Sequence, residues 1–347
     1  MNLYNCDMTT LVSWFQLEYP EIVQSMRESS HHGESLNPYH IEGTIFEHTL
    51  LVCKQAEKLP YTLKLAALLH DIGKPLTRSV NPKNGNVSFY NHDAVGAFHA
   101  LKILKREELG LSKKEQVFIF NLIALHTQIY KLDVEQLAAI GDKELVQGLI
   151  KLGKADHEGR FHTKGNAVIP HLISVESRMK KPRKIGTEKE VVVLVGLPAS
   201  GKSTWVRNFM DKRYDDNNFE YDIISRDKLV DQYGKGNTYS EKWSSVNQKL
   251  IDKKLQESFD NSKLNQYTDT IIVDMTHMSK KSRRRSLSHF GADYKKKAVV
   301  FLTDLEEIKL RNSKRVGKII PEEVYDKMLR SFYPPSLSEF DEIEYVI

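Results

Sequence analysis

The chain has 347 residues and a formal net charge of +5. Its two cysteines, Cys6 and Cys53, exclude a disulfide framework and a cysteine-based zinc finger. No apolar run reaches membrane-spanning length, and the first ten residues lack the features of a signal peptide. We therefore expect a cytoplasmic protein with two domains.

Residues up to about Ser174 predict helices almost throughout. Apolar residues recur at helical spacing in segments 63–70, 94–104, 115–126 and 146–156. Residues 81–90 (NPKNGNVSFY) break the pattern with turn residues and a short strand-like piece. Residues 1–175 are thus expected to form an all-α helical bundle.

Six side chains with metal-ligating chemistry lie on or beside these helices: His48, His70, Asp71, His92, His126 and Asp156. A single histidine on an apolar helix face is more often a core residue, but six candidates in order favour a metal centre. Their long spacings do not match zinc fingers and suit helices that converge on one site. Imidazole and carboxylate ligands without thiolate favour Mn, Fe, Co, Ni, Zn or Mg.

The segments HIEGTIFEHTLLV, LAALLHDIGKPLT and VSFYNHD resemble the HD-domain phosphohydrolases, most closely the HD domain of tRNA nucleotidyltransferases, over about residues 36–160. The resemblance implies one or two divalent metals, one held by His48, His70, Asp71 and Asp156. Asp71 would bridge to a second metal held by His92 and His126. Metals in such a site activate water for attack on phosphorus.

Three further residues of this half have two interpretations each. Lys74, one turn past Asp71, either contacts a phosphate oxygen or is an ordinary surface lysine. His40 and His157 either support the metal ligands or do not take part, and the sequence leaves both choices open.

Residues 176–190 are polar, contain proline and glycine, and predict a linker. Beyond them, strand-like runs alternate with helical ones, at 191–196, 221–225, 270–274 and 297–302. This alternation predicts an α/β domain with a parallel sheet over residues 191–347.

The run GLPASGKS, between a strand-like segment and a helix, fills the P-loop pattern through Gly196, Gly201, Lys202 and Ser203. The alternative is a glycine-rich turn that binds nothing, but both flanks fit the motif. We expect ATP or another nucleoside triphosphate with Mg²⁺, Lys202 on the β/γ-phosphates and Ser203 on the metal. Ser200, Thr204 and Arg311 complete the predicted ATP-binding residues.

Stretches further along the chain indicate what is phosphorylated. Asp227 and Asp274 each follow a strand-like run, where a carboxylate can take a proton from an attacking hydroxyl. Arg311, Lys314, Arg315 and Lys318 lie in a helix or lid. Each feature is weak alone, since Asp227 also suits a helix cap and the basic string an exposed helix.

Together, GLPASGKSTW, SRD, DMT–SRRR and RNSKR–IPEEV–M–SF resemble the phage-type 5′-hydroxyl polynucleotide kinases over about residues 191–332. The resemblance implies Asp227 as general base, Asp274 in the acceptor site and Arg315 as the lid arginine. Val230 stands where that family has an arginine on the acceptor phosphate. Arg226 or the cluster Arg283–Arg285, with Arg283 and Arg284 foremost, is our candidate replacement.

The order of the halves is similar to bacterial bifunctional end-healing enzymes. It implies a 5′-kinase joined to a 2′,3′-phosphatase, acting on RNA or DNA ends, with a separate ligase as functional partner. Basic runs at Lys180–Lys184, Lys280–Arg285 and Lys295–Lys297 favour a polyanionic substrate. One alternative is a small-molecule or nucleoside kinase with a nucleotide-hydrolysing HD half, and another is a regulatory, nucleotide-sensing HD half. The choice of RNA or DNA, the native metal and the oligomeric state stay open.

Overall fold

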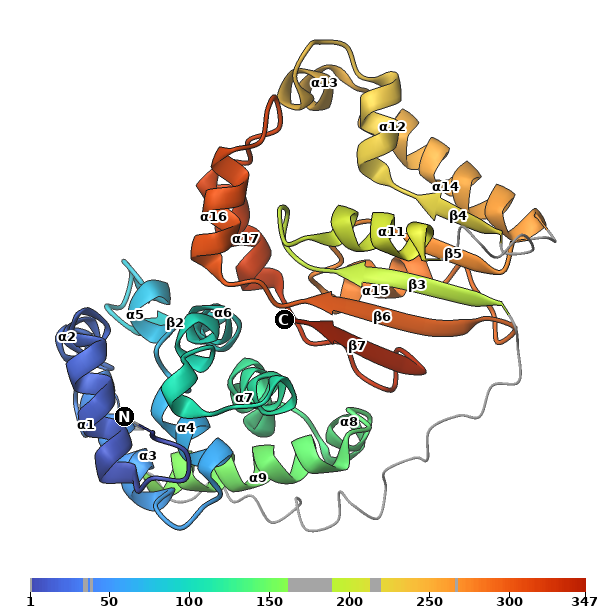
Figure 1. The fold of residues 1–347 in the computed structure, drawn as a ribbon. Helices are drawn as coiled ribbons and strands as arrows, with labels where there is room; N and C mark the ends of the chain where they lie inside the picture. The colour runs from blue at the N-terminus through green and yellow to red at the C-terminus, as the bar shows by residue number, and fades with distance from the viewer. Residues whose placement is uncertain (1, 34–36, 38–39, 162–188, 213–219, 266–267) are drawn as a thin grey trace. The chain divides into compact units, whose positions relative to one another are not determined.

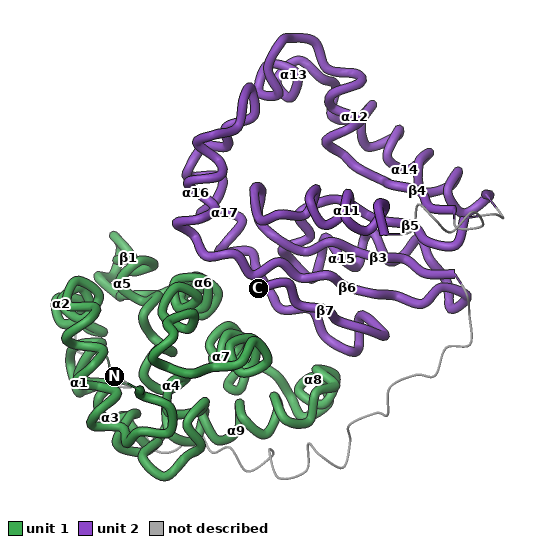
Figure 2. The backbone as a smooth tube through the Cα atoms, in the orientation of Figure 1, with its two compact units in different colours: residues 1–181 green, residues 182–347 purple. Residues whose placement is uncertain are grey.

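The computed structural model describes residues 2–33, 37, 40–161, 189–212, 220–265 and 268–347. The chain divides into two compact units, residues 1–181 and 182–347 (Figure 2). The expected linker at 176–190 lies outside the described residues except for its last two, and the basic run at 180–184 lies outside them entirely. Every helix within the described ranges is too short or too polar to span a lipid bilayer.

The first unit is a helical bundle, as the sequence predicts (Figure 1). Its α-helices are α1 (Met8–Glu18), α2 (Pro20–Glu28), α3 (Ile45–Gln55), α4 (Tyr61–Leu69), α5 (Lys74–Thr77), α6 (His92–Leu104), α7 (Lys113–Leu125), α8 (Val134–Ala138) and α9 (Lys143–Glu158). Two 3₁₀-helices, η1 (Glu107–Leu109) and η2 (His126–Tyr130), flank α7. The break predicted at 81–90 is part of an antiparallel hairpin, β1 (Arg78–Val80) with β2 (Val87–Phe89).

Helix α4 lies at the centre of this bundle. It packs against α3, α7 and α9, and most of its residues are buried. A helix that is apolar on nearly all sides belongs in a core, because each face removes apolar surface from water. His70 is its C-cap and Asp71 follows directly, so the helix delivers both side chains to the interior.

Gly73 allows two segments of the bundle to pack closely. It lies beyond the end of α4, which ends at Leu69. A Cβ added at Gly73 would lie 2.2 Å from the carbonyl oxygen of His92 and 2.6 Å from the backbone nitrogen of Gly96. The missing side chain therefore allows the segment after Asp71 to touch the start of α6, which carries His92.

The second unit contains a five-stranded sheet in the order β4-β5-β3-β6-β7, with every neighbouring pair parallel. The strands are β3 (Glu190–Val195), β4 (Tyr221–Ile224), β5 (Thr270–Val273), β6 (Lys295–Phe301) and β7 (Glu342–Val346). The helices are α11 (Lys202–Asp211), α12 (Arg226–Tyr233), α13 (Tyr239–Ser245), α14 (Gln248–Leu264), α15 (Lys280–Leu287), α16 (Leu305–Ser313) and α17 (Glu322–Ser331). The expected parallel α/β architecture is present (Figure 1).

The centre of this sheet is buried, and α11 covers one of its faces. Val192 and Leu194 of β3 pack with Val206 of α11 and with Phe301 of β6. Alternate residues of the same strand, such as Val193, are equally buried. Burial on both faces explains why β3 is a continuous apolar run, as is typical of a central parallel strand.

Strand β7 is missing from the sequence prediction. Its residues Glu342 and Glu344 each form an ion pair with Lys297 at 2.8 Å, and Glu342 also pairs with Lys295 at 2.5 Å. The basic run 295–297 therefore supports the β6–β7 edge through two of its lysines. Ion pairs thus account for two lysines of this run, and its contribution to binding a polyanionic substrate stays a prediction.

Candidate metal centre and phosphate-binding site

The six predicted ligands of the first unit meet inside the bundle. Nε2 of His48 lies 3.0 Å from Oδ1 of Asp156 and 3.6 Å from Oδ2 of Asp71. Nε2 of His70 lies 3.2 Å from the same Oδ2. The other Asp71 oxygen, Oδ1, lies 3.2 Å from Nε2 of His92 and 3.6 Å from Nε2 of His126. Asp71 therefore faces two groups of ligands at once.

The histidine rings are held with one nitrogen turned to the centre. In His70, His92 and His126, Nδ1–H donates to the carbonyl oxygen three positions earlier, at 2.8, 2.7 and 2.7 Å. His70 and His126 are helix C-caps, where the last carbonyls lack partners within the helix. Because a carbonyl oxygen only accepts, the neutral ring carries its proton on Nδ1 and presents a lone pair at Nε2.

These lone pairs need a cation. Nε2 of His92 lies 3.2 Å from Nε2 of His126, so two acceptors face each other. Nε2 of His70 and Oδ1 of Asp71 are buried without a hydrogen-bond partner among the described residues. A buried acceptor without a partner costs about 1–3 kcal/mol. Nitrogen and oxygen donors in this arrangement fit divalent metals such as Mn, Fe, Co, Ni or Zn.

Cationic side chains hold the two carboxylates in place. Burial opposes the charge of Asp156, yet Arg160 and His48 keep the pKa of Asp156 well below its usual value. Tyr130 also donates to Oδ2 of Asp156 at 2.8 Å. Burial likewise opposes the charge of Asp71, and the surrounding histidines with Lys74 hold the pKa of Asp71 well below its usual value.

Lys74 is buried, with its Nζ 2.7 Å from Oδ2 of Asp71. The interpretation of Lys74 as an ordinary surface lysine is therefore wrong. Its predicted contact with a phosphate stays a prediction. His157 lies half-buried in the last turn of α9.

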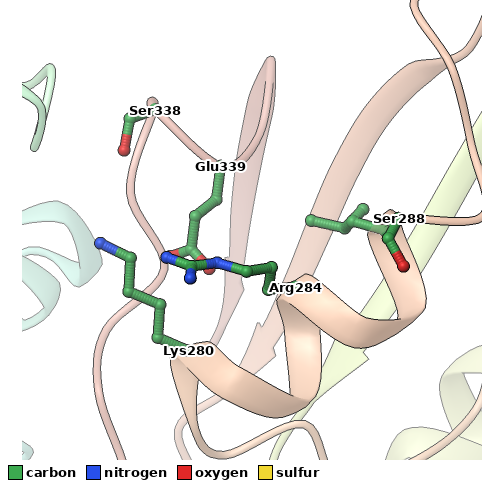
Figure 3. A pocket seen from close by; sticks show the side chains of 6 residues that line it. Lys280, Arg284, Ser288, Ser338 and Glu339 are labelled. Carbon is green, nitrogen blue, oxygen red and sulfur yellow. The ribbon is translucent and has the colours of Figure 1, made fainter.

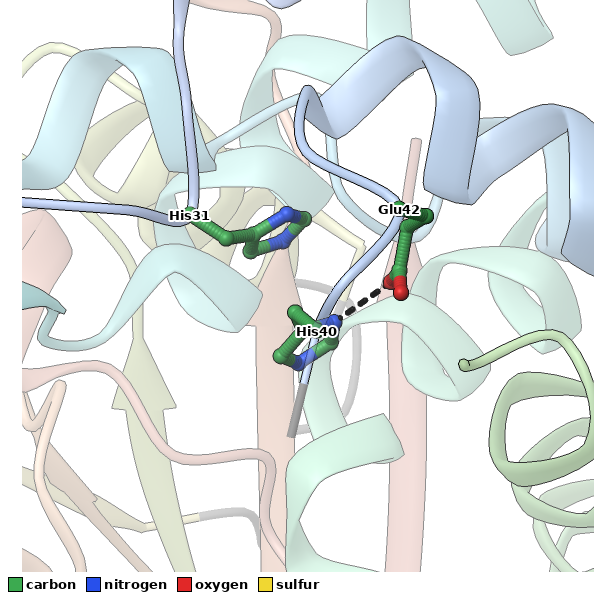
Figure 4. A group of neighbouring side chains, drawn as sticks. All are labelled: His31, His40 and Glu42. Atoms are coloured by element: carbon green, nitrogen blue, oxygen red, sulfur yellow. Dashed lines mark hydrogen bonds and ion pairs between the residues drawn. The ribbon is translucent and has the colours of Figure 1, made fainter. Parts of the chain in front are cut away.

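A second layer lies behind His48 and Lys74, and Figure 4 shows three of its side chains. The His31 and His40 rings stack with centroids 4.1 Å apart. One oxygen of Glu42 lies 2.8 Å from Nδ1 of His40 and 2.9 Å from Nδ1 of His48. Lys74 donates to Nε2 of His31 at 3.0 Å, which occupies that lone pair. The layer therefore orients both His48 and Lys74.

Sequence analysis missed His31 and Glu42 and left His40 open. Burial lowers the pKa of His40 to about 4 despite its hydrogen bond with Glu42. Burial and the nearby ammonium of Lys74 lower the pKa of His31 further. Both rings are neutral at physiological pH, so they act here by hydrogen bonding and stacking. In the sequence, His40 and Glu42 stand within the segment that resembles the HD pattern, and His31 precedes it.

The P-loop lies between β3 and α11, as the motif predicts. Ala199 and Gly201 have φ angles of 63° and 102°, and such turns point successive N–H groups into one concavity. A Cβ on Gly196 would lie 2.9 Å from Cβ of Phe301, so this position requires glycine. The start of α11 adds its positive dipole end. The loop can therefore cradle phosphate.

Three groups around this loop have the chemistry to donate hydrogen bonds to an anion. Lys202 donates to the carbonyls of Gly196 and Leu197 at 2.8 and 2.7 Å, and burial lowers its pKa to about 8. The Ser200 hydroxyl oxygen and Nη1 of Arg315 are buried without a hydrogen-bond partner in the described part of the chain. A phosphate provides the oxygens that such donors need. Ser203 and Thr204 are exposed at the start of α11.

The two predicted carboxylates stand at the same sheet edge as the P-loop. Asp227 lies in the first turn of α12, directly after β4, and Asp274 follows β5. The three strands β4, β5 and β3 are parallel neighbours, so their carboxyl ends meet. The charges of both carboxylates reach Lys202, whose pKa they raise against the effect of burial. Burial raises the pKa of Asp274.

The loop between α16 and α17 reaches Asp227. Lys318 donates to Oδ2 of Asp227 at 2.5 Å. Asn312 closes this loop, because its side-chain amide bonds both backbone groups of Ile320, at 2.9 and 3.0 Å. Burial opposes the charge of Asp227, yet the hydrogen bond from Lys318 lowers the pKa of Asp227. Arg311 donates to the carbonyl of Ala199 at 3.5 Å.

Arg283 does not face a polynucleotide acceptor, so the prediction that it provides the acceptor contact missing at Val230 is wrong. Its side chain is fully buried and donates to Glu339 at 2.8 and 3.1 Å. It also donates to the carbonyls of Met278 and Tyr333 at 3.3 and 2.9 Å. The residue therefore ties the loop after β5 to the segment after α17. A basic run in the sequence carries no sign that one member is a core residue.

The other replacement candidates remain compatible with acceptor binding. Arg284 is exposed and, with Lys280, lines a pocket of about 340 Å³ (Figure 3). Arg226 is half-buried and donates to Asp252 at 2.6 Å. Val230 is fully buried, in a cluster with Val246 and Ile251. An arginine at position 230 would therefore place a charged side chain in this core.

Comparisons with known proteins agree with this two-part construction. Residues 45–154 match the family model of the HD domain, and residues 191–335 match that of an AAA domain. The chain joins an HD domain to a P-loop kinase-like domain. Residues 191–335 are thus of a nucleotide-binding class.

Individual relatives cover parts of this chain. An A-adding tRNA nucleotidyltransferase of Deinococcus radiodurans is 33% identical over 148 residues, 39% of this chain and 33% of that protein. The heterogeneous nuclear ribonucleoprotein U-like protein 2 of Homo sapiens is 25% identical over 188 residues, 51% of this chain and 24% of that protein. The chain thus spans about a quarter to a third of the length of these relatives.

Two solved structures are similar at low identity. Kti12 of Chaetomium thermophilum in complex with ADP-AlF3 is 14% identical with a TM-score of 0.34, covering 45% of this chain and 88% of that one. APE1195 is 19% identical with a TM-score of 0.28, covering 46% and 87%.

Proposed function

We propose that this protein heals broken polynucleotide strands. Its P-loop unit would phosphorylate 5′-hydroxyl ends with ATP, and its HD unit would remove 3′-phosphates or open 2′,3′-cyclic phosphates. The observation that carries the proposal is that Asp227 and Asp274 share one sheet edge with Lys202, in a chain that also holds a two-carboxylate, four-histidine centre. A 5′-phosphate and a free 3′-hydroxyl are the ends that a ligase joins, so a ligase is the expected functional partner.

In the kinase step, the 5′-hydroxyl oxygen attacks the γ-phosphorus of ATP. The hydroxyl proton passes to Asp227, the bond from the γ-phosphorus to the β–γ bridging oxygen breaks, and ADP leaves. Asp227 is ionised near neutral pH, as an aspartate ordinarily is, and the hydrogen bond from Lys318 lowers its pKa further. Each carboxylate oxygen keeps a second lone pair for the substrate. Lys202 and Arg315 would neutralise the charge that spreads over the transferring group.

In the hydrolytic step, the metals would be held by His48, His70, Asp71, His92, His126 and Asp156. When bound, they supply an activated water and neutralise phosphate charge. Lys74 places an ammonium beside Asp71, where it would bind a phosphate oxygen of the strand end. The Nδ1 hydrogen bonds keep the histidine rings oriented through the reaction.

Two further observations support a nucleic-acid substrate. The names of the two curated relatives refer to a tRNA enzyme and a ribonucleoprotein. The α15 run also keeps exposed cations, Lys280 and Arg284, around one pocket. Clustered cations attract phosphate backbones.

The test uses one oligoribonucleotide and one oligodeoxynucleotide, each with a 5′-hydroxyl and a 3′-phosphate, given ATP, Mg²⁺ and Mn²⁺. Wild type is compared with Lys202→Ala and Asp71→Ala, with both ends scored. We expect the first variant to lose only 5′ phosphorylation and the second only 3′ dephosphorylation, so each serves as the other's folding control. If wild type hydrolyses ATP but leaves both ends unchanged, the proposal fails in favour of a small-molecule acceptor.

A further inference from the structure

Helix α13 carries two aromatic rings beside the proposed general base. Tyr239 donates its phenolic hydrogen to Oδ1 of Asp227 at 2.6 Å. Trp243 follows one turn later, with ring centroids 6.1 Å apart and planes tilted by 32°. One ring of this pair therefore contacts Asp227 directly, and the second ring lies beside the first.

Each ring also has a cation over it. Nζ of Lys318 lies 4.0 Å from the centroid of Tyr239, and the guanidinium of Arg226 lies 5.7 Å from the centroid of Trp243. Hydrogen bonds to Asp252 and Gln248 hold Arg226 in this position. Aromatic rings that alternate with cations are the elements with which proteins bind single-stranded nucleic acid.

Packing does not explain why an indole stands here. Helix α13 contains no buried residue, and 42% of the surface of Trp243 is exposed. The helix is nevertheless fixed: a capping box between Thr238 and Glu241 starts it, and the Tyr239 backbone N–H donates to the carbonyl of Gly317 at 2.7 Å. Helix α13 is thus fixed in position, and its backbone is hydrogen-bonded to the loop that carries Lys318 (Figure 1).

We propose that Tyr239 and Trp243 form the stacking site for the bases at the 5′ end of a single-stranded polynucleotide acceptor. The site rests on the proposed kinase function and names how that acceptor is bound. Arg226 and Lys318 lie over one face of each ring, so the bases would stack on the other faces, with both cations near the flanking phosphates. The site also replaces the acceptor contact that the buried Val230 does not provide. Stacking tolerates any base, so binding here is independent of sequence.

The test measures 5′ phosphorylation of a single-stranded 5′-hydroxyl oligonucleotide by wild type, Trp243→Ala and Trp243→Phe. Stacking of one base is worth about 1–3 kcal/mol, so Trp243→Ala raises the KM for the oligonucleotide roughly 5- to 150-fold. Its KM for ATP, which binds at the P-loop, keeps the wild-type value. Trp243→Phe recovers most of the oligonucleotide KM, since it restores an aromatic face.

The matched control is Leu264→Ala. Leu264 is 81% exposed at the far end of α14, about 24 Å along that helix from its start. This variant should keep the wild-type KM for the oligonucleotide.

A direct binding measurement accompanies the kinetics. Titration of the protein with the oligonucleotide, without ATP, should quench tryptophan emission, and Trp243→Phe should remove that change while the oligonucleotide still binds. Equal KM values in wild type and Trp243→Ala overturn the stacking site while leaving the kinase function intact. Absence of polynucleotide phosphorylation in wild type removes both.

Discussion

Nδ1 of His48 and a carboxylate oxygen of Glu42 lie 2.9 Å apart, and the same oxygen lies 2.8 Å from Nδ1 of His40. Glu42 therefore contacts the His48 ring at Nδ1, on the side opposite the nitrogen that faces the metal centre, although Glu42 is not one of the six ligands. Loss of such a supporting carboxylate usually weakens metal binding by 10- to 100-fold.

We predict that Glu42→Ala lowers metal affinity by about this factor, because the His48 ring loses its orientation. The measurement is bound Mn²⁺ or Zn²⁺ at fixed free metal, set by a competing chelator. Glu42→Gln should recover part of the loss, since its amide oxygen still accepts from Nδ1. Glu158→Ala, an exposed glutamate on α9, is the matched control. Equal affinity in Glu42→Ala and wild type would contradict the supporting role.

A second prediction concerns Gly73. The Cβ of alanine would lie 2.2 Å from the carbonyl oxygen of His92, so the start of α6 must move away from Asp71. We expect Gly73→Ala to lower bound metal and phosphoester hydrolysis, while ATP hydrolysis by the P-loop unit in the same chain continues. Metal content by mass spectrometry and both activities check this. Full metal content in Gly73→Ala would show that α6 adjusts without loss.

The candidate ligands could be named from the sequence because their residue types and order resemble the HD-domain pattern. His70-Asp71 ends an apolar helical run, and the phosphate loop is continuous along the chain, so both motifs are recognisable. The residues that support the ligands fall outside the six-ligand pattern. Glu42 contacts His48 across the N-cap of α3, within one short segment, whereas His31 reaches Lys74 over 43 positions. Nothing in the pattern specifies those contacts.

In highly charged segments, the sequence pattern also fails to distinguish buried from exposed residues. The run KKSRRR favours a polyanionic substrate, yet Arg283 within it is a core residue because Glu339, 56 positions later, supplies its partner. The charged segment that contains Glu342 likewise forms a strand, β7, that the sequence pattern does not predict. Its pairing with β6 depends on lysines whose partners the sequence does not identify.

The contrast between Arg283 and its neighbour Arg284 gives a third prediction. Removal of one partner of a buried ion pair costs about 3–5 kcal/mol, because the other charge stays buried. Arg283→Ala should therefore lower the free energy of unfolding by about this amount, whereas Arg284→Ala, at an exposed position, should change it by less than about 0.5 kcal/mol. Urea unfolding of the two variants measures both values. Comparable stability would mean that Glu339 finds another partner.

The last prediction concerns the pH dependence of stability and His277. This buried ring donates Nδ1–H to the carbonyl of Leu194 at 3.1 Å and receives a hydrogen bond from Ser286 at 2.8 Å. Burial lowers its pKa from 6.5 to about 4. The unfolded state therefore binds more protons between these values, so stability is full above pH 6.5 and falls as the pH drops towards 4.

For this one group the expected loss between pH 7.5 and pH 5.5 is about 1 kcal/mol. His277→Asn removes the titrating ring and keeps a donor for Leu194, and asparagine tolerates the positive φ of 43° at this position. Urea unfolding of wild type and variant at both pH values cancels the other histidines, which the two chains share. The variant should lose about 1 kcal/mol less than wild type on acidification. Equal losses would show that His277 takes up a proton without cost in the folded state.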